Sequence, residues 1–358
     1  MKRMRLVILL FVVFISGCSG LSERRQQGEV ENVETAGQPE KGNSPEIMLT
    51  KLKTPWSISK TEDIFFISER EGSIVKWEDA KVKRETVQLK QPLSTRAEAG
   101  LLGFVPHPDF SSKQLAYAYY TYEKNGTPLN RVITLHYTDG KWVEQDILLD
   151  NIPSGDYHHG GRIKIGPDGK LFVTTGDATK SEIAQDKKSL GGKILRMNLD
   201  GSIPEDNPIP DSYVYSFGHR NPQGLAWSEE GQLYSGEHGP SAHDEINKIT
   251  AGRNYGWPII VGSEKNPGME SPIFNSGTNT WAPSGIAYHQ NIIYAAALRG
   301  EAVKAFNLKT DEISDMVSGR GRIRDVFIDG DALYFISNNT DGRGTPDQQD
   351  DRLYRIQL

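Results

Sequence analysis

One pattern of apolar and polar positions recurs along most of the chain. A short apolar stretch is followed by a polar turn rich in Pro, Asp, Gly and Asn, and then by a second apolar stretch, as in a tight β-hairpin. A third apolar stretch follows every copy, and a fourth follows five of them. Four antiparallel strands repeated six times predict an all-β fold, a six-bladed β-propeller of four-stranded blades. The six copies begin at Pro55, Gly103, Arg162, Gly224, Gly285 and Asp325.

The last copy is one strand short, because the chain ends at Leu358 after its third stretch. Residues 45–52 form an apolar stretch that precedes the first copy and belongs to no repeat of its own. We predict that this N-terminal strand completes the last blade and closes the ring, which removes two exposed sheet edges. No helical periodicity separates the strands, so a parallel sheet with crossover helices is disfavoured.

The first residues have the composition of a secretion signal. A basic start precedes an apolar run over residues 6–15, which is too short for a typical transmembrane helix. The run ends in "ISGC", which resembles the lipobox of bacterial lipoproteins, and Cys18 is the only cysteine in the chain. We therefore expect residues 1–17 to be a lipoprotein signal peptide and Cys18 to carry the lipid. The alternative is an ordinary signal peptide with a chance cysteine.

The segment after Cys18 is polar, charged and free of aromatic residues as far as about residue 43. Such a composition predicts a flexible tether over residues 18–44, followed by the propeller domain over residues 45–358. The protein would then lie outside the cytoplasm, held at the bacterial membrane by its lipid anchor alone. A net charge of −6 with no basic run beyond the first residues argues against nucleic acid as the main partner.

The loops that enter the first strand of five successive repeats carry polar side chains of a particular kind. In a propeller such loops open onto the central channel, so these side chains are expected to meet there. Arginine binds carboxylates through a two-pronged fork, which suggests a small ligand with several carboxylates. Histidine beside such a ligand is the usual general base near neutral pH. The alternative is that these side chains are polar only because the channel openings of propellers are exposed to solvent. The residues are Glu98, His158, His219, Arg220, Asn221, Trp281, Arg320, Arg322 and Arg324.

His158 and His159 stand side by side at one of these loops. Adjacent residues that enter a strand point to opposite sides, so the two histidines are expected to have separate tasks. We assign His158 to the channel and His159 to packing or loop structure.

A second cluster covers residues 235–258, "SGEHGPSAHDEINKITAGRNYGWP". The carbonyls of Gly239 and Pro240, together with Asp244 and Glu245, are oxygen ligands suited to Ca²⁺. The alternative metal is Zn²⁺, held by His238 and His243 with His158 or His159. That alternative is weaker, because no cysteine is available and the histidine spacing matches no zinc signature.

Several longer stretches carry a resemblance to a known family. They are "GLLGFVPHPDF", "HHGGRIKIGPDGKLFVTTGD", "GGKILRMNLDGSIPEDNP", "GHRNPQGLAW", "GEHGPSAHDEIN", "GRNYGWP", "APSGIAY" and "RIRDV". With these stretches the chain resembles the PQQ-dependent soluble aldose sugar dehydrogenases, the glucose/sorbosone dehydrogenase family. The resemblance implies a six-bladed propeller and oxidation of aldose sugars at C1 to lactones, with electrons passing on to an acceptor that the sequence does not identify.

The resemblance also implies roles for individual residues. His158 matches the base that takes the proton of the C1 hydroxyl while the hydride passes to PQQ, and Asp177 matches the acid that orients it. Arg220 matches the arginine that stabilises charge on the quinone oxygen. Gly239 and Pro240 match backbone ligands of a Ca²⁺ on PQQ, and Glu245 and the Tyr255 carbonyl match a second, structural Ca²⁺ site. The positions matching the PQQ site are Glu98, His158, Arg220, Asn221, His238, Arg322 and Arg324.

The sequence departs from the glucose enzyme at several of these positions. Glu98 and His238 replace glutamines, and Tyr157 stands where that enzyme has an acid that contacts the sugar. Its lysine on the fifth blade has no clear counterpart, although Arg299 lies nearby. A broad range of aldoses is therefore expected rather than glucose alone. Two alternatives remain: a non-catalytic propeller that binds a sugar or cell-wall component, and a metal-dependent lactonase, for which the entry loops lack converging carboxylate and amide ligands.

Overall fold

The structure is a computed structural model that describes residues 32–35 and 44–358. The predicted signal peptide, Cys18 and most of the predicted tether lie outside the described residues. Asn32–Leu358 form one compact unit, which is all-β apart from two short helical turns, α1 (Phe110–Lys113) and η1 (Ser181–Ala184). No described helix has the length and apolar character needed to cross a membrane.

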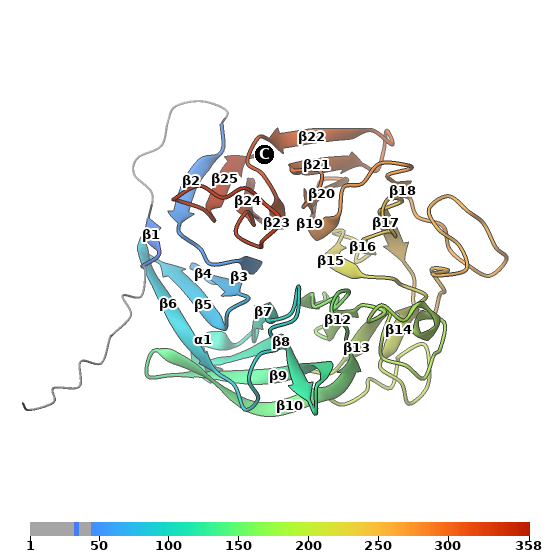
Figure 1. The fold of residues 1–358 in the computed structure, drawn as a ribbon, viewed down its shortest axis with the longest axis horizontal. Coiled ribbons are helices and arrows are strands. Elements are labelled where there is room, and N and C mark those ends of the chain that lie inside the picture. The colour runs from blue at the N-terminus through green and yellow to red at the C-terminus, as the bar shows by residue number, and fades with distance from the viewer. Residues whose placement is uncertain (1–31, 36–43) are drawn as a thin grey trace, which may run out of the picture. The chain divides into compact units, whose positions relative to one another are not determined.

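Three sheets have four antiparallel strands that follow one another in chain order, as the repeats predict (Figure 1). The first comprises β11 (Ile163–Ile165), β12 (Leu171–Thr175), β13 (Lys193–Met197) and β14 (Val214–Phe217). The second comprises β15 (Pro222–Trp227), β16 (Leu233–Glu237), β17 (Glu245–Ile249) and β18 (Phe274–Asn275). The third comprises β19 (Pro283–His289), β20 (Ile292–Ala297), β21 (Ala302–Asn307) and β22 (Ile313–Ser318).

A larger sheet of eight strands contains two such groups of four. One group is β3 (Pro55–Thr61), β4 (Ile64–Glu69), β5 (Ser73–Glu78) and β6 (Lys81–Gln88). The other is β7 (Leu101–Pro106), β8 (Leu115–Lys124), β9 (Thr127–Thr138) and β10 (Lys141–Pro153). The groups join through a short parallel pairing of β6 with β10, at Trp142 opposite Val87 and Val143 opposite Gln88. The sequence pattern did not predict this pairing of outer strands.

The remaining sheet combines the two ends of the described chain, in the order β1, β2, β25, β24, β23. Its strands are β1 (Glu34–Thr35), β2 (Glu46–Thr50), β23 (Ile323–Asp329), β24 (Ala332–Ser337) and β25 (Leu353–Gln357). β2 pairs antiparallel with β25, with Glu46 opposite Arg355 and Leu49 opposite Leu353. The predicted pairing of residues 45–52 with the last repeat is therefore present.

The structure differs from the prediction of a flexible tether at residues 33–35. Glu34 and Thr35 pair with Thr50 and Leu49 of β2 as a fifth strand. Val33 is buried in the same apolar cluster as Leu49 and Leu52. Burial of this valine and coverage of the free edge of β2 explain why the segment is held there.

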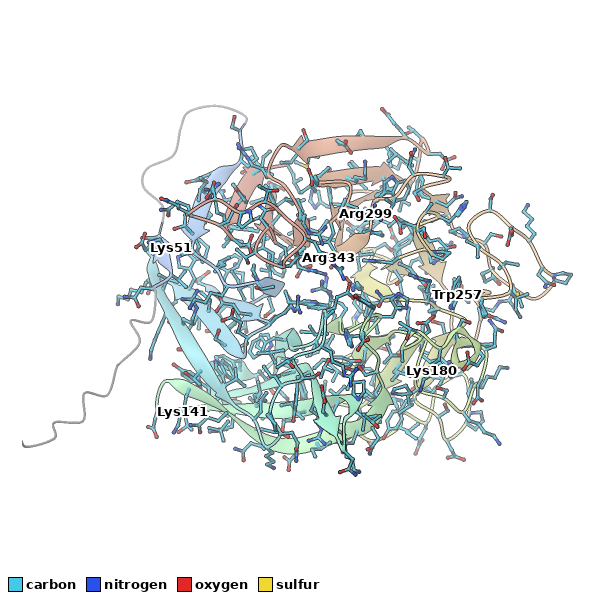
Figure 2. The ribbon with its side chains drawn as sticks, in the orientation of Figure 1. Lys51, Lys141, Lys180, Trp257, Arg299 and Arg343 are labelled. Atoms are coloured by element: carbon cyan, nitrogen blue, oxygen red, sulfur yellow. The ribbon has the colours of Figure 1, made fainter. Side chains whose placement is uncertain are left out.

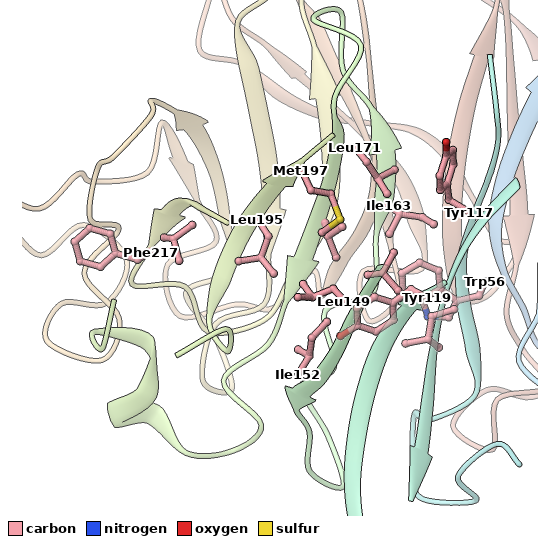
Figure 3. Close-up of a cluster of buried hydrophobic side chains, with 14 residues drawn as sticks. Trp56, Tyr117, Tyr119, Leu149, Ile152, Ile163, Leu171, Leu195, Met197 and Phe217 are labelled. Atoms are coloured by element: carbon pink, nitrogen blue, oxygen red, sulfur yellow. The ribbon is translucent and has the colours of Figure 1, made fainter. Parts of the chain in front are cut away.

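The first strands of neighbouring sheets contact one another, which places them toward the centre of the described unit (Figure 1). β3 contacts β7 and β23, β7 contacts β11, and β19 contacts both β15 and β23. Apolar side chains fill the space between the sheets. One cluster joins Trp56, Tyr119, Ile163 and Leu195, which come from β3, β8, β11 and β13 (Figure 3). This arrangement of sheets around a centre is that of a β-propeller.

Leu49→Ala is expected to lower the free energy of unfolding by about 2–5 kcal/mol, because the side chain of Leu49, in β2, is fully buried. Ile47→Ala is the matched control, since Ile47 lies in the same strand with 36% of its surface exposed. It should cost about 1 kcal/mol or less. Urea unfolding of both variants measures the difference, and equal losses would contradict the role of β2 as a core strand.

Candidate active site

The loops before the first strands bring most of the predicted site residues to one end of the channel. Glu98 precedes β7, His158 precedes β11, and Arg220 and Asn221 precede β15, while Arg324 lies at the start of β23. These groups are near enough to influence one another: the charge of Glu98 acts on His238, Arg220 and Arg324. Figure 2 shows Arg343 near the centre of the view, in the region where the first strands converge.

His158 is held by the buried carboxylate of Asp177. Its Nδ1 lies 2.7 Å from Asp177 Oδ1, and Asp177 also accepts hydrogen bonds from the Thr179 peptide N–H (2.8 Å) and from Trp257 Nε1 (2.9 Å, to Oδ2). The His158 side chain keeps 18% of its surface exposed, whereas that of Asp177 keeps 2%. With Nδ1 bound to Asp177, Nε2 is the ring nitrogen left to meet a ligand. The sequence missed Trp257 as a partner of this pair.

The backbone at His158 depends on a glycine across from it. His158 has a left-handed conformation with φ of 63°, and its carbonyl faces Gly176. A Cβ atom on Gly176 would lie 1.9 Å from the His158 carbonyl oxygen, so only glycine fits beside this turn.

His159 is buried and uses both ring nitrogens within the protein. Nδ1 lies 2.8 Å from Ser154 Oγ, and Nε2 lies 3.1 Å from the Ala97 carbonyl oxygen. Burial lowers its pKa, so the ring is neutral at neutral pH. The two histidines therefore have separate tasks, as expected from their positions before a strand.

Arg220 is fixed on three sides. Its peptide N–H donates to the Glu237 carboxylate, one Nη donates to the His238 carbonyl (3.2 Å), and its guanidinium lies 5.4 Å above the Trp257 ring. Burial lowers the pKa of Arg220, whereas Asp177 and Glu237 act in the opposite direction. Trp257 thus contacts both Arg220 and the acid that orients His158.

His219 and Asn221 support the loop around Arg220. His219 is buried, with Nδ1 2.8 Å from Glu237 Oε2 and Nε2 2.8 Å from Ser216 Oγ. Asn221 accepts a hydrogen bond from the Gly160 N–H (3.0 Å), which ties this loop to the neighbouring histidine loop. His219, expected to face the channel, is instead a structural residue.

Arg322 and Arg324 lie side by side and share one acidic neighbour, Asp341. Arg322 donates to Asp341 through Nη2 (2.8 Å), while the nearest nitrogen of Arg324 is 3.8 Å from the same carboxylate. Arg324 donates to Asn338 (2.9 Å) and Gln223 (3.1 Å), and burial lowers its pKa to about 9. Two guanidiniums against one carboxylate leave a positive charge beside the channel.

Glu98 is paired with Arg343, which the sequence did not identify as part of the site. Arg343 Nη1 lies 2.5 Å from Glu98 Oε1, and its guanidinium lies 5.5 Å from the Tyr157 ring. Burial acts to raise the pKa of Glu98, but the charge and hydrogen bond of Arg343 outweigh it and lower that pKa to about 2. Glu98 is therefore an anion in the structure and serves as the partner of Arg343.

Among the described histidines, His238 is the one with a buried ring nitrogen that has no hydrogen-bond partner. Its Nε2 is buried and has no hydrogen-bond partner among the described residues. Burial lowers its pKa to about 4, so the ring is neutral at neutral pH. A buried polar atom without a partner costs free energy, which makes this nitrogen a contact point for a ligand.

The loop after β16 lines a small pocket with the predicted calcium residues Gly239, Pro240, Glu245 and Tyr255. Burial raises the pKa of Glu245 to about 8, and the nearby Glu237 carboxylate adds to the effect. Two buried carboxylates beside backbone carbonyls make a donor set that suits a cation such as Ca²⁺.

Asp244 does not fit the expected role of a ligand. Its Oδ1 accepts a hydrogen bond from Gly239 N–H (2.9 Å), and its Oδ2 accepts three more, from Thr280 Oγ1 (2.8 Å), Trp281 N–H (2.6 Å) and Ala282 N–H (2.8 Å). Asp244 thus joins the loop after β16 to the residues directly before β19.

The prediction that Trp281 faces the channel is wrong, because Trp281 is buried against Phe306 and belongs to the core. For the zinc alternative, no three His, Cys, Asp or Glu side chains gather as ligands within the described ranges.

Comparisons with known proteins agree with this picture. The model of the glucose/sorbosone dehydrogenase family matches residues 52–354. Quinoprotein glucose dehydrogenase B of Acinetobacter calcoaceticus is 37% identical over 210 residues, which span 50% of this chain and 44% of that protein. Aldose sugar dehydrogenase YliI of Escherichia coli is 29% identical over 346 residues, 83% of this chain and 90% of that protein.

The solved structures include the PQQ-bound form of an aldose sugar dehydrogenase from Streptomyces coelicolor. It is 35% identical to this chain and superposes with a TM-score of 0.82, covering 89% of this chain and 99% of that one. A structure described as a gluconolactonase is only 13% identical, with a TM-score of 0.51, and shares the fold alone.

Proposed function

Because this chain belongs to the glucose/sorbosone dehydrogenase family, we propose that it is a quinoprotein sugar dehydrogenase that oxidises aldoses at C1 to lactones with PQQ and Ca²⁺. The observation that carries the proposal is the His158–Asp177 pair beside Arg220, at the end of the channel where the entry loops meet. The likeness to a PQQ-bound aldose sugar dehydrogenase over most of the chain supports the same conclusion.

We propose further that the six groups of strands are six blades, with the eight-stranded sheet contributing two of them. The pairing of β2 with β25 and the contact of β23 with β3 support closure of the ring by the N-terminal strand. A closed ring holds the entry loops at fixed positions, which a site built from several loops requires.

The residues around the channel fit a ligand with several carboxylates. The positive charge that Asp341 leaves on Arg322 and Arg324 would bind them, and Asn221 and the free Nε2 of His238 would add polar contacts. Asp341, the acidic partner of Arg322, also lines a cavity of about 500 Å³ together with Arg70. Glu98 would position Arg343 rather than contact the cofactor carboxylates directly, because like charges repel.

PQQ supplies the two-electron acceptor when it is bound. His158 Nε2 would take the proton from the C1 hydroxyl, and Asp177 would stabilise the imidazolium that forms. The partly exposed ring of His158 can then pass the proton to water. Arg220 would stabilise negative charge that develops beside its guanidinium, as oxyanion-type sites do.

Ca²⁺ would bind the carbonyls of Gly239 and Pro240, and a second ion would bind Glu245 and the Tyr255 carbonyl. Both sets line the pocket beside Arg220 and His238, so a bound cation would also neutralise the buried carboxylates there.

Reduction of a dye by the purified full chain, with PQQ, Ca²⁺ and a panel of aldoses, tests the function. We expect saturable turnover with several aldoses, and loss of turnover when EGTA removes Ca²⁺. Magnesium added in place of calcium is the control, because it prefers a smaller octahedral site with retained waters. Failure of PQQ to bind would refute the proposal, and PQQ-independent binding of sugars without turnover would favour a binding propeller.

Trp257→Phe is expected to lower kcat about tenfold with KM nearly unchanged. The phenylalanine keeps an aromatic ring beside Arg220 but removes the hydrogen bond to Asp177, worth about 1.5 kcal/mol. Trp77→Phe is the matched control, because the Trp77 indole nitrogen is buried and has no hydrogen-bond partner among the described residues. Steady-state kinetics of both variants measure the effect, and an unchanged kcat in Trp257→Phe would contradict the positioning role.

We also propose that Cys18 anchors the protein outside the cytoplasm through a lipid. The lipobox-like "ISGC" and the single cysteine support it. Labelling with a radioactive fatty acid in a bacterial host should be lost in Cys18→Ser, which should also leave the membrane fraction. Equal labelling of the two chains would refute the anchor.

A further inference from the structure

A second cavity lies at the opposite end of the channel from His158. It measures about 310 Å³ and is lined by the final residues of several first strands. Because Glu98, His158 and Arg220 precede these same strands, the cavity and the proposed active site occupy opposite ends of the channel. Residues that line it include Ser59 of β3, Pro106 of β7, Lys164 of β11, Trp227 of β15 and Phe327 of β23.

Arg162, which lines the cavity, is held in a buried ion pair with Asp325. Arg162 Nη1 lies 2.8 Å from Asp325 Oδ2, and the same oxygen accepts the Ile58 N–H at 2.7 Å. Arg162 Nε donates to the Gln223 carbonyl (2.8 Å), and the guanidinium packs 4.3 Å from the Trp56 ring. Both charged side chains are 2% exposed.

Three hydrogen-bond donors at this inner end are left without full partners. Ser59 Oγ and Arg162 Nη2 are buried and have no hydrogen-bond partner among the described residues. Lys164 Nζ makes one bond, to the Ile286 carbonyl at 3.3 Å, although an ammonium group has three donors. Native proteins satisfy nearly all buried donors, so the two buried donors beside the partly exposed Lys164 ammonium indicate a ligand.

The charges at the cavity do not cancel. Asp325 pairs with Arg162, and Asp329 pairs with Lys60 at 2.6 Å. Burial lowers the pKa of His107, the remaining basic group, which is neutral at neutral pH. Lys164 has no carboxylate within ion-pair distance in the part of the chain that the structure describes. Burial lowers the pKa of Lys164 to about 8, so it is still mostly a cation at neutral pH, and the cavity carries one unbalanced positive charge.

The outer walls are apolar, with Val105, Pro106, Ile165, Trp227 and Phe327 among the lining residues. An inorganic anion would leave these walls in contact with water, whereas an organic acid would cover them. We propose that this cavity binds a small organic carboxylate, whose acid group bonds Lys164, Arg162 and Ser59 and whose apolar part lies against Trp227 and Phe327. None of these residues belongs to the proposed PQQ site, so the two proposals stand or fall separately.

Fluorine NMR of 4-fluorobenzoate with the purified full chain tests the proposal. We expect a saturable shift or broadening of the ligand signal, and binding that is about tenfold weaker or worse in Lys164→Met, because a charge-assisted hydrogen bond is lost. Lys60→Met is the matched control. Lys60 lines the same cavity, but Asp329 neutralises it, so its loss should change affinity less than about twofold.

Three results would overturn the proposal. The first is equal binding of 4-fluorobenzyl alcohol, which has the same ring without the charge. The second is unchanged affinity in Lys164→Met. The third is preferential binding of inorganic phosphate over 4-fluorobenzoate in competition, which would make this an inorganic anion site. If Lys164→Met unfolds, Ser59→Ala replaces it with a smaller expected loss of affinity, and unchanged binding in that variant counts against the site.

Discussion

Replacement of His158 by alanine is expected to lower kcat for aldose oxidation by about 10²–10⁴-fold while PQQ still binds. Among the residues that the structure describes, the imidazole is the only basic side chain hydrogen-bonded to Asp177, and its Nε2 is the nitrogen free to accept a proton. The contacts proposed for PQQ come from other loops, through Arg220, Asn221, Arg322 and Arg324, so cofactor affinity should survive. Dye-linked turnover and PQQ titration by absorbance, measured on the same preparation, separate the two effects.

His159→Gln is the matched control for His158→Ala. It changes the adjacent histidine, which is buried and bonded to Ser154 and Ala97. We expect lower stability and a kcat within a few-fold of the parent, because both ring nitrogens of His159 are already bonded within the protein. The kcat of Asp177→Asn should lie between those of His158→Ala and His159→Gln, since the imidazole of His158 stays but loses the carboxylate that stabilises its charged form. A His158→Ala protein that keeps more than about a tenth of the parental kcat would contradict its role as the base.

The sequence predicted the strands well because each hairpin is encoded locally. Apolar stretches and Gly, Asp and Pro turns lie within a few residues of one another, and a missing fourth strand pointed to residues 45–52. Pairings without such a pattern were missed. β1 has only two residues, and the contact of β6 with β10 rests on two residue pairs between outer strands. Their formation depends on neighbouring sheets, which a local pattern does not reveal.

The site residues likewise include some that a local sequence pattern predicts and others that only the folded chain reveals. Loops that enter the first strands were identified because propeller topology brings them together, and they supply Glu98, His158 and Arg220. Asp341, Arg343 and Trp257 were missed, because they lie on loops between later strands of their sheets. The run "TDGRGTPDQQDD" before β25 is unusually charged for a hairpin loop and was the one available signal for Asp341 and Arg343.

Asp244 illustrates why a residue type alone does not define a ligand. An aspartate beside Gly239 and Pro240 looks like a calcium ligand in the sequence. In the structure its oxygens accept four hydrogen bonds, three of them from residues 280–282, which directly precede β19. Those donors lie more than thirty positions away, so only the folded chain reveals that the carboxylate is already occupied.

Buried charges connect the two ends of the channel through shared partners. Gln223 accepts a hydrogen bond from Arg324 through its side chain (3.1 Å) and one from Arg162 through its carbonyl (2.8 Å). Arg162 in turn pairs with Asp325, which also binds the backbone of β3. The arginines proposed for PQQ are therefore supported by the same core that forms the wall of the second cavity.

Asp325→Ala is expected to lower the free energy of unfolding by about 3–5 kcal/mol, because it leaves the buried Arg162 guanidinium without its carboxylate. It also removes the acceptor for the Ile58 N–H, which joins β23 to β3. Asp329→Ala in the same strand is the control. Its pair with Lys60 is partly exposed, so the loss should be about 1 kcal/mol or less.

Urea unfolding of these variants, with the double variant Arg162→Met/Asp325→Leu, separates the ion pair from the packing around it. The double variant should recover part of the stability lost in Asp325→Ala, because no buried charge is then left unpaired and apolar side chains of similar volume fill the space. If Asp325→Ala costs no more than Asp329→Ala, neither the ion pair with Arg162 nor the hydrogen bond from Ile58 contributes the expected stability. If the double variant is as unstable as Asp325→Ala, the loss comes from the Ile58 hydrogen bond rather than from the unpaired charge of Arg162.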